Sequence, residues 1–304
     1  MAALHNFHEQ AVFEKSLNVS FLALIPKKAN AVEVKDFCPI SLVGGIYKII
    51  SKVLANRLQR VAHSLILDSQ NAFVKSRQIL DSNLIASECI DSRMKMGVPG
   101  VIYKLDIEKA YNHVNWNFLM YILKRCGFSE KWRRWIMWCM STVKFSILIN
   151  GSPVDFFGST RGVRQGNPLS PLLFDIVIEA LSRMLDAIAM LGQFSGFSVG
   201  NSVGSLLTVS HLLFVDDTLI FCDVDSHHLA ALRGILARFE VVSWLKINLP
   251  KSEVVPIGNV PNMDELVEIL GCQQSSLPLK YLGLPLGASH KEETIWNLVL
   301  KKME

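Results

Sequence analysis

The 304-residue sequence has no uninterrupted apolar run of the length that a membrane-spanning helix needs, although 50% of its residues are hydrophobic. Its longest apolar stretches, such as SLLTVSHLLFV, are interrupted by Ser, Thr and His. The opening residues, MAALHNFHEQ, lack the basic lead-in and apolar core of a secretory signal. These absences predict an intracellular protein with no membrane partner, without distinguishing nucleus from cytoplasm.

The sequence also lacks any C-x-x-C pair, the spacing found in many zinc sites and redox motifs. Scattered cysteines of this kind predict reduced thiols rather than a disulfide framework or a zinc cluster. The six are Cys38, Cys89, Cys126, Cys139, Cys222 and Cys272.

The sequence also has little net charge and no internal repeats. The formal net charge is only +4, which leans towards a polyanionic partner but does not identify one by itself. No internal repeat, low-complexity tract or Ser/Gly-rich linker divides the chain. The sequence is therefore that of a globular protein, with a regular pattern of hydrophobic residues.

The hydrophobic pattern predicts helices interleaved with antiparallel hairpins. Residues 45–66 have apolar positions at a helical period, with Lys48 and Lys52 opposite the apolar stripe and Arg57 within it. A lone buried charge is unfavourable, so Arg57 must find a partner in the protein or a phosphate. Other predicted elements are a strand at 19–25, a hairpin around Asn150-Gly151, a helix that starts at Ser170-Pro171, a helix at 226–243 and a hairpin at 277–287. This order predicts an α+β fold.

Three acidic residues interrupt apolar strands: Asp106 in VIYKLDI, and Asp216 and Asp217 in HLLFVDDTLIF. If the two segments lie side by side, the carboxylates meet at one edge of a sheet. Crowded carboxylates repel one another, so cations favour the cluster, and oxygen ligands select Mg²⁺ or Mn²⁺. Spacing alone leaves a plainer alternative, in which Asp216-Asp217 is a hairpin turn between two strands.

Seven segments, in order, resemble the motifs of the reverse transcriptase domain of non-LTR (LINE-type) retrotransposons, particularly those of plants. The resemblance extends from about residue 17 to residue 288. The segments are SLNVSFLALIPKKANAVEVKDFCPISLVGGIYKIISKVLANRL, SQNAFVKSRQILDSNLIASE, VIYKLDIEKAYNHVNW, TRGVRQGNPLSPLLF, HLLFVDDTLIF, LKINLPKSE and LPLKYLGLPLG.

This resemblance implies a right-hand polymerase fold, with an antiparallel palm sheet backed by helices. Residues 1–97 would form the fingers with a further segment at about 118–157, and 98–288 would form the palm. Residues 289–304 would begin a truncated thumb, so the thumb would be largely missing. The other domains of such elements would be absent from this chain.

The implied reaction is attack of a DNA primer 3′-hydroxyl on the α-phosphate of a dNTP, directed by an RNA template, with two Mg²⁺ ions (Mn²⁺ as the alternative). Asp106 and Asp216 would be the main metal ligands, supported by Asp217 and by the backbone carbonyl of Ile107.

Further roles follow from the same resemblance. Tyr111 would stack under the incoming sugar, its alternative being a core aromatic, and Gln165 and Gly166 would lie against the incoming nucleotide. Four cations complete the implied site: Arg164 would face template phosphate or be a solvated loop charge, Lys251 would protonate pyrophosphate or be an ordinary exposed lysine, and Lys75 and Arg77 would contact triphosphate or template.

Five positions depart from the family pattern: Cys38, Asn112, Asn167, Val215 and Trp244. Val215 is expected to be well tolerated because β-branched residues suit strands, whereas Trp244 is unfavourable if the backbone there has a positive φ. The departures leave open an inactive relic that keeps only RNA or primer–template binding. A protein-interaction scaffold unrelated to nucleic acid would require the carboxylate set to be accidental.

Overall fold

The computed structural model describes residues 2–12, 14–200 and 207–288. The chain forms two compact units, each built from separated segments. The first unit combines residues 1–66, 109–177 and 242–244, and the second combines 67–108, 178–241 and 245–304.

A four-stranded sheet forms one part of the first unit, in the order β2 (Phe37–Val43), β1 (Val19–Pro26), β5 (Lys144–Ile149), β6 (Ser152–Phe157). β1 pairs antiparallel with β2 and parallel with β5. The predicted hairpin between β5 and β6 is confirmed, with φ of 50° at Asn150 and 81° at Gly151. Positive φ at both central residues is the conformation that an Asn-Gly hairpin turn adopts.

Helices form the rest of the first unit: α1 (Ala2–Gln10), α2 (Gly45–Leu65), α4 (Ala110–His113), α5 (Trp116–Arg125), α6 (Glu130–Ser141) and the first part of α7 (Ser170–Met190). The side chains of Asn115 and Ser129 cap α5 and α6 by accepting backbone amide hydrogen bonds. Arg57 of α2 is exposed, so the expectation of a buried charge that must find a partner is wrong. Its guanidinium lies 5.2 Å from the ring centroid of Trp132 and 5.4 Å from that of Trp135, where it makes cation–π contacts.

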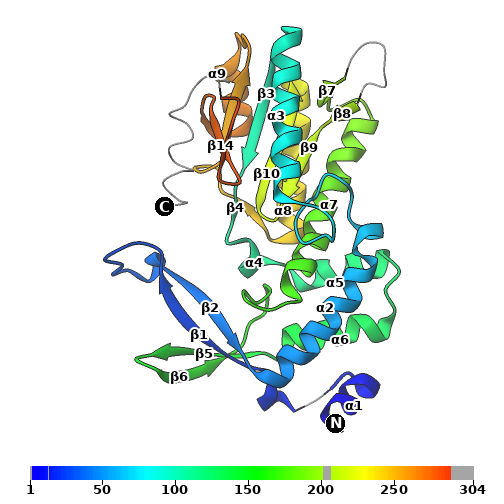
Figure 1. Cartoon of the computed structure of the whole chain (residues 1–304), viewed down its shortest axis with the longest axis vertical. Helices are drawn as coiled ribbons and strands as arrows, with labels where there is room; N and C mark the ends of the chain where they lie inside the picture. Colours follow the sequence, from blue (N-terminus) through cyan, green and yellow to red (C-terminus); the bar gives the residue numbers. More distant parts are fainter. Residues whose placement is uncertain (1, 13, 201–206, 289–304) are drawn as a thin grey trace. The chain divides into compact units, whose positions relative to one another are not determined.

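The second unit is organised around a five-stranded sheet (Figure 1). Its strand order is β13 (Gln273–Gln274), β12 (Glu253–Ile257), β3 (Gly100–Leu105), β10 (Asp217–Asp223), β9 (His211–Phe214). The four strands from β12 to β9 are antiparallel. β3 is buried along nearly its whole length, as expected for a central strand covered on both faces.

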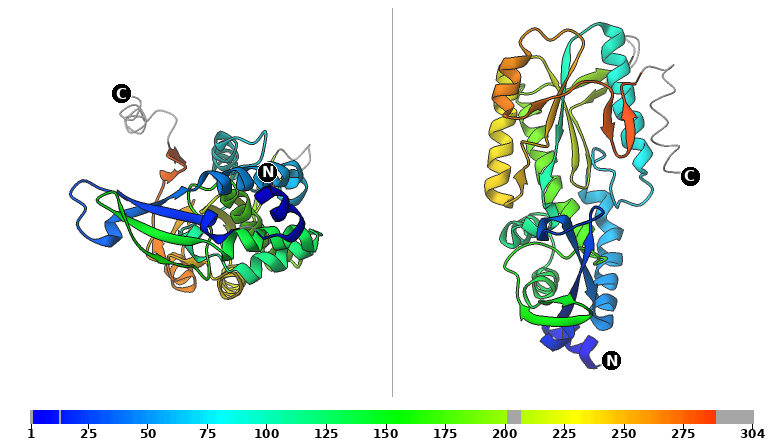
Figure 2. Two further views of the ribbon diagram at one scale, coloured as in Figure 1. Left: turned by 90° about the horizontal axis from the view of Figure 1, so that it is seen from below. Right: turned by 90° about the vertical axis from the view of Figure 1, so that its left-hand side faces the viewer.

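Helices cover both faces of this sheet: α3 (Ile79–Met96) lies on one side and α8 (Ser226–Ser243) on the other, as Figure 2 shows. α9 (Met263–Leu270) and the part of α7 from Ile178 onwards complete the helices of the second unit in the described ranges. The hairpin of β14 (Leu279–Tyr281) and β15 (Leu284–Leu286) packs on the same side as α3, since Ile90, Ile102 and Tyr281 belong to one buried core. Short strand pairs complete the unit: β4 (Ile107–Glu108) with β11 (Lys246–Ile247), and β7 (Phe197–Val199) with β8 (Leu207–Val209).

The predicted α+β class, with an antiparallel sheet backed by helices, is confirmed. The division into fingers and palm stays a prediction, and the compact units divide the chain at other positions; residues 67–97, for example, belong to the unit of the five-stranded sheet. The predicted start of a thumb at 289–304 lies outside the described residues. No helix in the described ranges is both long and apolar enough to span a membrane.

Two of the unusual positions, Val215 and Trp244, have left-handed backbone conformations. The φ angle is 58° at Val215 and 63° at Trp244. The condition under which Trp244 was expected to be unfavourable is therefore met. The expectation that Val215 is well tolerated is wrong, because Val215 lies in a turn rather than a strand and a β-branched residue with positive φ is strained.

Candidate active site

Asp106 and Asp217 are neighbours on adjacent central strands. Thr218 of β10 pairs with Leu105 of β3 in antiparallel register. Asp217 precedes Thr218 and Asp106 follows Leu105, so the two acidic residues occupy the next position across the same strand pair. Residues opposite each other on antiparallel strands lie about 5 Å apart at Cα. The convergence expected from the sequence is therefore present.

Asp216 stands at the tip of the β9–β10 hairpin. Phe214 pairs with Asp217, which leaves Val215 and Asp216 as the two turn residues. The sequence pattern had suggested Asp216-Asp217 as the turn, and the structure corrects this by one residue. Asp217 is the first residue of β10, so only Asp216 is a turn carboxylate.

The three carboxylates are close enough to influence one another. Burial is the main cause that raises the pKa of the Asp216 carboxyl, and the charge of Asp106 raises it further. Burial also raises the pKa of Asp217, followed by repulsion from Asp216, while Lys104 lowers it. In the described part of the chain neither Asp216 nor Asp217 forms an ion pair.

This donor set fits a hard divalent cation, because half-buried carboxylates that repel one another are stabilised by positive charge. The described residues contain no group of three His, Cys, Asp or Glu side chains already gathered into a metal cluster. The residues therefore suit a metal by their chemistry, while a closed coordination site is not formed by the protein alone.

A short turn, 248–252, holds the backbone of Asp106. The Asn248 amide donates to the Asp106 carbonyl oxygen at 2.9 Å, and the Asp106 amide donates to the Ser252 hydroxyl at 3.1 Å. The Ser252 hydroxyl in turn donates to the Asn248 carbonyl oxygen at 3.0 Å. Lys251 lies in this turn and is exposed. Ile107 is next to Asp106 in β4, where it pairs with Ile247. The sequence reasoning missed Asn248 and Ser252, whose signal was their place beside Lys251 in NLPKS.

A cavity of about 460 Å³ opens beside the β9–β10 turn. Its lining combines two carboxylates, from Asp216 and Asp217, with two lysines, Lys104 and Lys280, and apolar groups that include Leu282. All of these residues belong to the second unit. Lys104 was not singled out from the sequence, although a lysine inside the apolar strand VIYKL was a visible signal.

The predicted nucleotide-binding residues Tyr111, Gln165 and Gly166 belong to the first unit. Gly166 has φ of 82°, and a Cβ there would lie 3.3 Å from the Ser41 carbonyl oxygen, so glycine suits both the backbone and the space. Gln165 lines a cavity of about 260 Å³. The ring of Tyr111 is stacked on Phe174 with centroids 4.9 Å apart, a packing contact that agrees with its core-aromatic alternative.

Arg164 does not have the surroundings of a template-binding residue. It is only 7% exposed, and its guanidinium donates to the Ser20 hydroxyl at 3.1 Å and to the Cys139 carbonyl oxygen at 2.6 Å. The same group lies 3.7 Å from the centroid of the Tyr47 ring. Burial lowers the pKa of this guanidinium. The sequence suggested that Arg164 either contacts the template or is a solvated loop charge. Both interpretations are wrong, because the guanidinium is buried and forms its hydrogen bonds within the protein.

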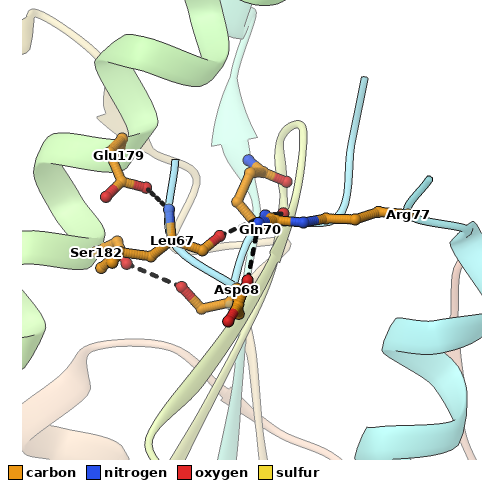
Figure 3. A network of polar contacts seen from close by, with 7 residues as sticks. Leu67, Asp68, Gln70, Arg77, Glu179 and Ser182 are labelled. Atoms are coloured by element: carbon orange, nitrogen blue, oxygen red, sulfur yellow. Dashed lines mark hydrogen bonds and ion pairs between the residues drawn. The ribbon is translucent and has the colours of Figure 1, made fainter. Parts of the chain in front are cut away.

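Arg77 is likewise used inside the protein, as Figure 3 shows. Its guanidinium donates to the carbonyl oxygens of Leu67 and Gln70 at 2.5 Å each and contacts the Asp68 carboxylate at 2.8 Å. Its expected contact with triphosphate or template therefore lacks support in this geometry. Lys75, on the same loop, is exposed and remains a candidate.

Two of the departures from the family pattern have partners. The Cys38 thiol lies 3.8 Å from the Gln165 amide oxygen. The Asn167 amide nitrogen donates to the Tyr47 hydroxyl at 3.0 Å, and its oxygen accepts from the Leu169 amide at 3.1 Å. Asn167 thus satisfies both ends of its amide in a buried position. Asn112, by contrast, has an exposed side chain.

Residues 25–286 match the family model described as "Reverse transcriptase (RNA-dependent DNA polymerase)". A Pol polyprotein from the type-1 retrotransposable element R2 of Nasonia vitripennis is 30% identical over 198 residues, which cover 64% of this chain and 18% of that protein. The transposon TX1 149 kDa protein of Xenopus laevis is 30% identical over 52% of this chain and 12% of its own length.

A mitochondrial protein of Arabidopsis thaliana, AtMg01250, is 41% identical over 71 residues, which cover 23% of this chain and 56% of that protein. The chain thus spans less than a fifth of the length of the R2 and TX1 proteins above. Among solved structures, telomerase from Candida tropicalis in complex with a telomeric RNA fragment superposes with a TM-score of 0.59. Its sequence identity is 14%, with 88% of this chain and 43% of that chain covered, so the likeness is one of fold.

Proposed function

Because the chain belongs to the reverse transcriptase family, we propose that it catalyses RNA-directed DNA synthesis, adding dNTPs to the 3′-hydroxyl of a DNA primer. It would do so as the polymerase domain of a LINE-like element, in line with its similarity to R2 and TX1 proteins. The RNA template, the primer and the dNTPs are its proposed partners.

The observation that carries this proposal is the proximity of Asp106, which follows β3, to Asp217, which begins β10, and to Asp216 in the β9–β10 turn. Asp106 and Asp216, supported by Asp217 and the carbonyl of Ile107, would hold two divalent cations, Mg²⁺ or alternatively Mn²⁺. Bound there, such ions supply positive charge for the attacking hydroxyl and the departing pyrophosphate. Burial is the main cause of the raised pKa values of Asp216 and Asp217, and repulsion between the carboxylates, which this charge would relieve, raises them further.

Residues of the chain itself would bind and orient the reactants. Gly166 allows close approach of the backbone to the incoming nucleotide, with Gln165 beside it. Tyr111, which packs on Phe174, would stack under the sugar. The exposed ammonium of Lys251, on the turn that holds Asp106, would donate a proton to pyrophosphate.

Primer extension tests this function. With a DNA primer on an RNA template and Mg²⁺, we expect the protein to extend the primer, and Asp216→Asn to lower the rate by about 10³-fold. That magnitude corresponds to several kcal/mol of charge stabilisation lost in the transition state. Asp91→Asn, which neutralises an exposed carboxylate on α3, is the matched control and should extend normally.

An inactive relic that still binds primer–template is the second candidate, favoured by the strained backbone at Val215 and Trp244. Binding of the duplex with no extension by either the wild type or Asp216→Asn would establish the relic and refute the polymerase.

A further inference from the structure

Helix α2 carries apolar side chains on the surface of the first unit. Ile46, Ile49 and Val53 are separated by three and then four residues, so they share one face of the helix. Ile49 is 56% exposed and Val53 is 51% exposed, although another side of the same helix already buries its own apolar residues. Helix α2 therefore has a second apolar face, which the described residues leave open to solvent.

This second face borders a groove between three helices. A cavity of about 200 Å³ is lined by Ile49 and Val53 of α2, by Phe7 of α1 and by Trp135 of α6, among others. Phe7 and Trp135 hold α1 against α6, because their rings stack with centroids 6.0 Å apart and the Trp135 indole donates to the Phe7 carbonyl oxygen at 3.0 Å. The α1–α2–α6 groove is chiefly apolar and lies wholly within the first unit.

The cations of α2 have no acidic partners. The helix contains no Asp or Glu in its 21 residues, and its cations are Lys48, Lys52, Arg57 and Arg60. None of the four forms an ion pair with another described residue. Arg57 lines the groove itself, where its guanidinium contacts aromatic rings rather than a carboxylate. The α2 side of the groove is therefore positively charged without compensation.

One carboxylate, that of Glu9, follows the groove residue His8 on α1. It contacts His8 and the Lys131 ammonium of α6, the latter at 3.8 Å. Lys131 in turn lies 5.6 Å from the ring centroid of Trp135. The charge of Glu9 is thus shared with cations on the α1 and α6 side, and it leaves the excess positive charge of α2 in place.

We propose that the α1–α2–α6 groove binds an acidic amphipathic helix of a partner protein. Apolar side chains spaced at i, i+4 and i+7 on that helix fill the groove, which is the way amphipathic helices bind apolar grooves. Acidic residues beside them pair with Lys52, Arg57 and Arg60. The inference does not depend on the polymerase function, because none of these residues belongs to the candidate active site.

The form of the groove distinguishes a helix from other occupants. Pockets for small molecules usually hold about 300–1,000 Å³, which is more than this groove provides. Single-stranded nucleic acid stacks its bases on accessible aromatic rings, whereas Trp135 is only 5% exposed. A membrane accepts an apolar face that lies flat on its surface, whereas the face of α2 borders a recess. An aromatic-lined recess with a charged rim is typical of the centre of a protein interface.

The first test measures peptide binding by fluorescence anisotropy. The probe is a fluorescent helical peptide with Leu at i, i+4 and i+7 and Glu at the positions beside them. We expect a dissociation constant on the order of 10 μM and a loss of about tenfold in Ile49→Ser. Met94→Ser, which removes a 55% exposed side chain from α3, is the matched control and should bind as the wild type. Absence of binding, or equal binding by Ile49→Ser, would overturn the proposal.

The second test exchanges charge between the protein and the peptide. Lys52→Glu should weaken binding of the acidic peptide about threefold and reduce its dependence on salt. A peptide with Lys in place of Glu should bind Lys52→Glu better than it binds the wild type. Lys95→Glu, which changes an exposed charge on α3, should leave both affinities unaltered. A Lys peptide that binds the wild type as tightly as the Glu peptide would refute the preference for an acidic partner.

Two further measurements detect other occupants. Analytical ultracentrifugation reports self-association, and co-flotation with vesicles of phosphatidylcholine and phosphatidylserine reports membrane binding. A dimer or a vesicle complex that is lost in Ile49→Ser would assign the groove to a second copy or to a lipid surface and overturn the proposal. Val53→Ser tests the same face if Ile49→Ser folds poorly. None of these results requires primer extension, so failure of the polymerase function is distinguishable from failure of this inference.

Discussion

His211 lies in β9, where both ring nitrogens meet serine hydroxyls. Nε2 is 2.6 Å from the Ser182 hydroxyl and Nδ1 is 2.8 Å from that of Ser210. Ser182 also contacts Ser69 at 3.0 Å, so the ring ties β9 to α7 and to the loop that precedes α3. Burial of the imidazole lowers its pKa from 6.5 to about 4.

A depressed histidine pKa makes stability fall with acidity. Between pH 6.5 and 4 the unfolded chain binds a proton at His211 that the folded protein does not, so the free energy of unfolding decreases as the pH falls. From pH 7 to pH 5 we expect the free energy of unfolding of the wild type to fall by about 2 kcal/mol relative to that of His211→Gln. Urea unfolding at each pH measures it, and parallel stability curves would contradict the prediction.

Val215 in the β9–β10 turn and Trp244 directly after α8 both have a strained backbone. A non-glycine residue with positive φ is less stable by roughly 1–2 kcal/mol than in its ordinary conformations. Val215 precedes Asp216 in the hairpin turn, so the strain lies directly beside a candidate catalytic carboxylate. The sequence showed an unusual residue here but not the conformation that makes it unfavourable.

Among the elements, the 67–78 loop has little regular structure yet is extensively bonded. The Leu67 amide donates to the Glu179 carboxylate of α7 at 3.1 Å, and Leu213 of β9 exchanges backbone hydrogen bonds with Ser69 and Asn71. Arg77 closes the loop from the other end through its bonds to two carbonyl oxygens (Figure 3). The loop therefore behaves as an extra edge of the sheet.

Replacing Arg77 should loosen that edge. In Arg77→Met the Leu67 and Gln70 carbonyl oxygens lose their charged donor, and we expect amide hydrogen exchange at Asn71 and Leu213 to accelerate about tenfold, the effect of about 1.4 kcal/mol. Asp68→Asn should have little effect, because the Asp68 side chain is fully exposed and surface ion pairs contribute little. Exchange in Arg77→Met as slow as in the wild type would show that the loop holds without the guanidinium.

Local signals predicted most of the elements. The apolar period gave the helices now seen as α2 and α8, and Asn150-Gly151 gave the hairpin of β5 and β6, because these features depend on residues close together in the chain. Arg164 and Arg77 could not be placed in the same way. The partners of Arg164, Ser20 and Cys139, lie in segments that only the tertiary fold brings near. Those of Arg77 are close in sequence, but they are backbone carbonyl oxygens of an irregular loop, whose conformation no periodic pattern reveals.

At the scale of the whole molecule, the carboxylate site opposes folding. Because folding raises the pKa of Asp216 and Asp217, their ionised forms destabilise the native state above the pKa of the unfolded chain. This disadvantage disappears as the pH falls and the carboxyls become protonated. The convergence of Asp106 with the pair was predicted from the motif order. The support from Asn248 and Ser252 was not, since their place beside Lys251 gave no sign that their hydrogen bonds reach Asp106.

A bound divalent cation should offset this destabilisation of the native state. Without metal at pH 7 we expect Asp217→Asn to be more stable than the wild type, and Mg²⁺ at five times its dissociation constant to stabilise the wild type by about 1 kcal/mol. The double variant Asp216→Asn, Asp217→Asn should gain nothing from Mg²⁺. Denaturant titrations with Mg²⁺ and with EDTA measure both effects, and equal stabilisation of wild type and double variant would place the ion elsewhere.

The register of β3 against β10 determines which mutations would separate the carboxylates. Side chains alternate between faces, so one residue inserted or deleted before Asp106 in β3 would turn Asp106 towards the opposite face and Leu105 or Ile107 into its place. Substitutions, such as those at Cys38 in β2 or at Trp244 after α8, leave that alternation intact. A copy of this domain can therefore accumulate many substitutions with its carboxylates still aligned, whereas a single in-frame insertion or deletion in this strand separates them at once.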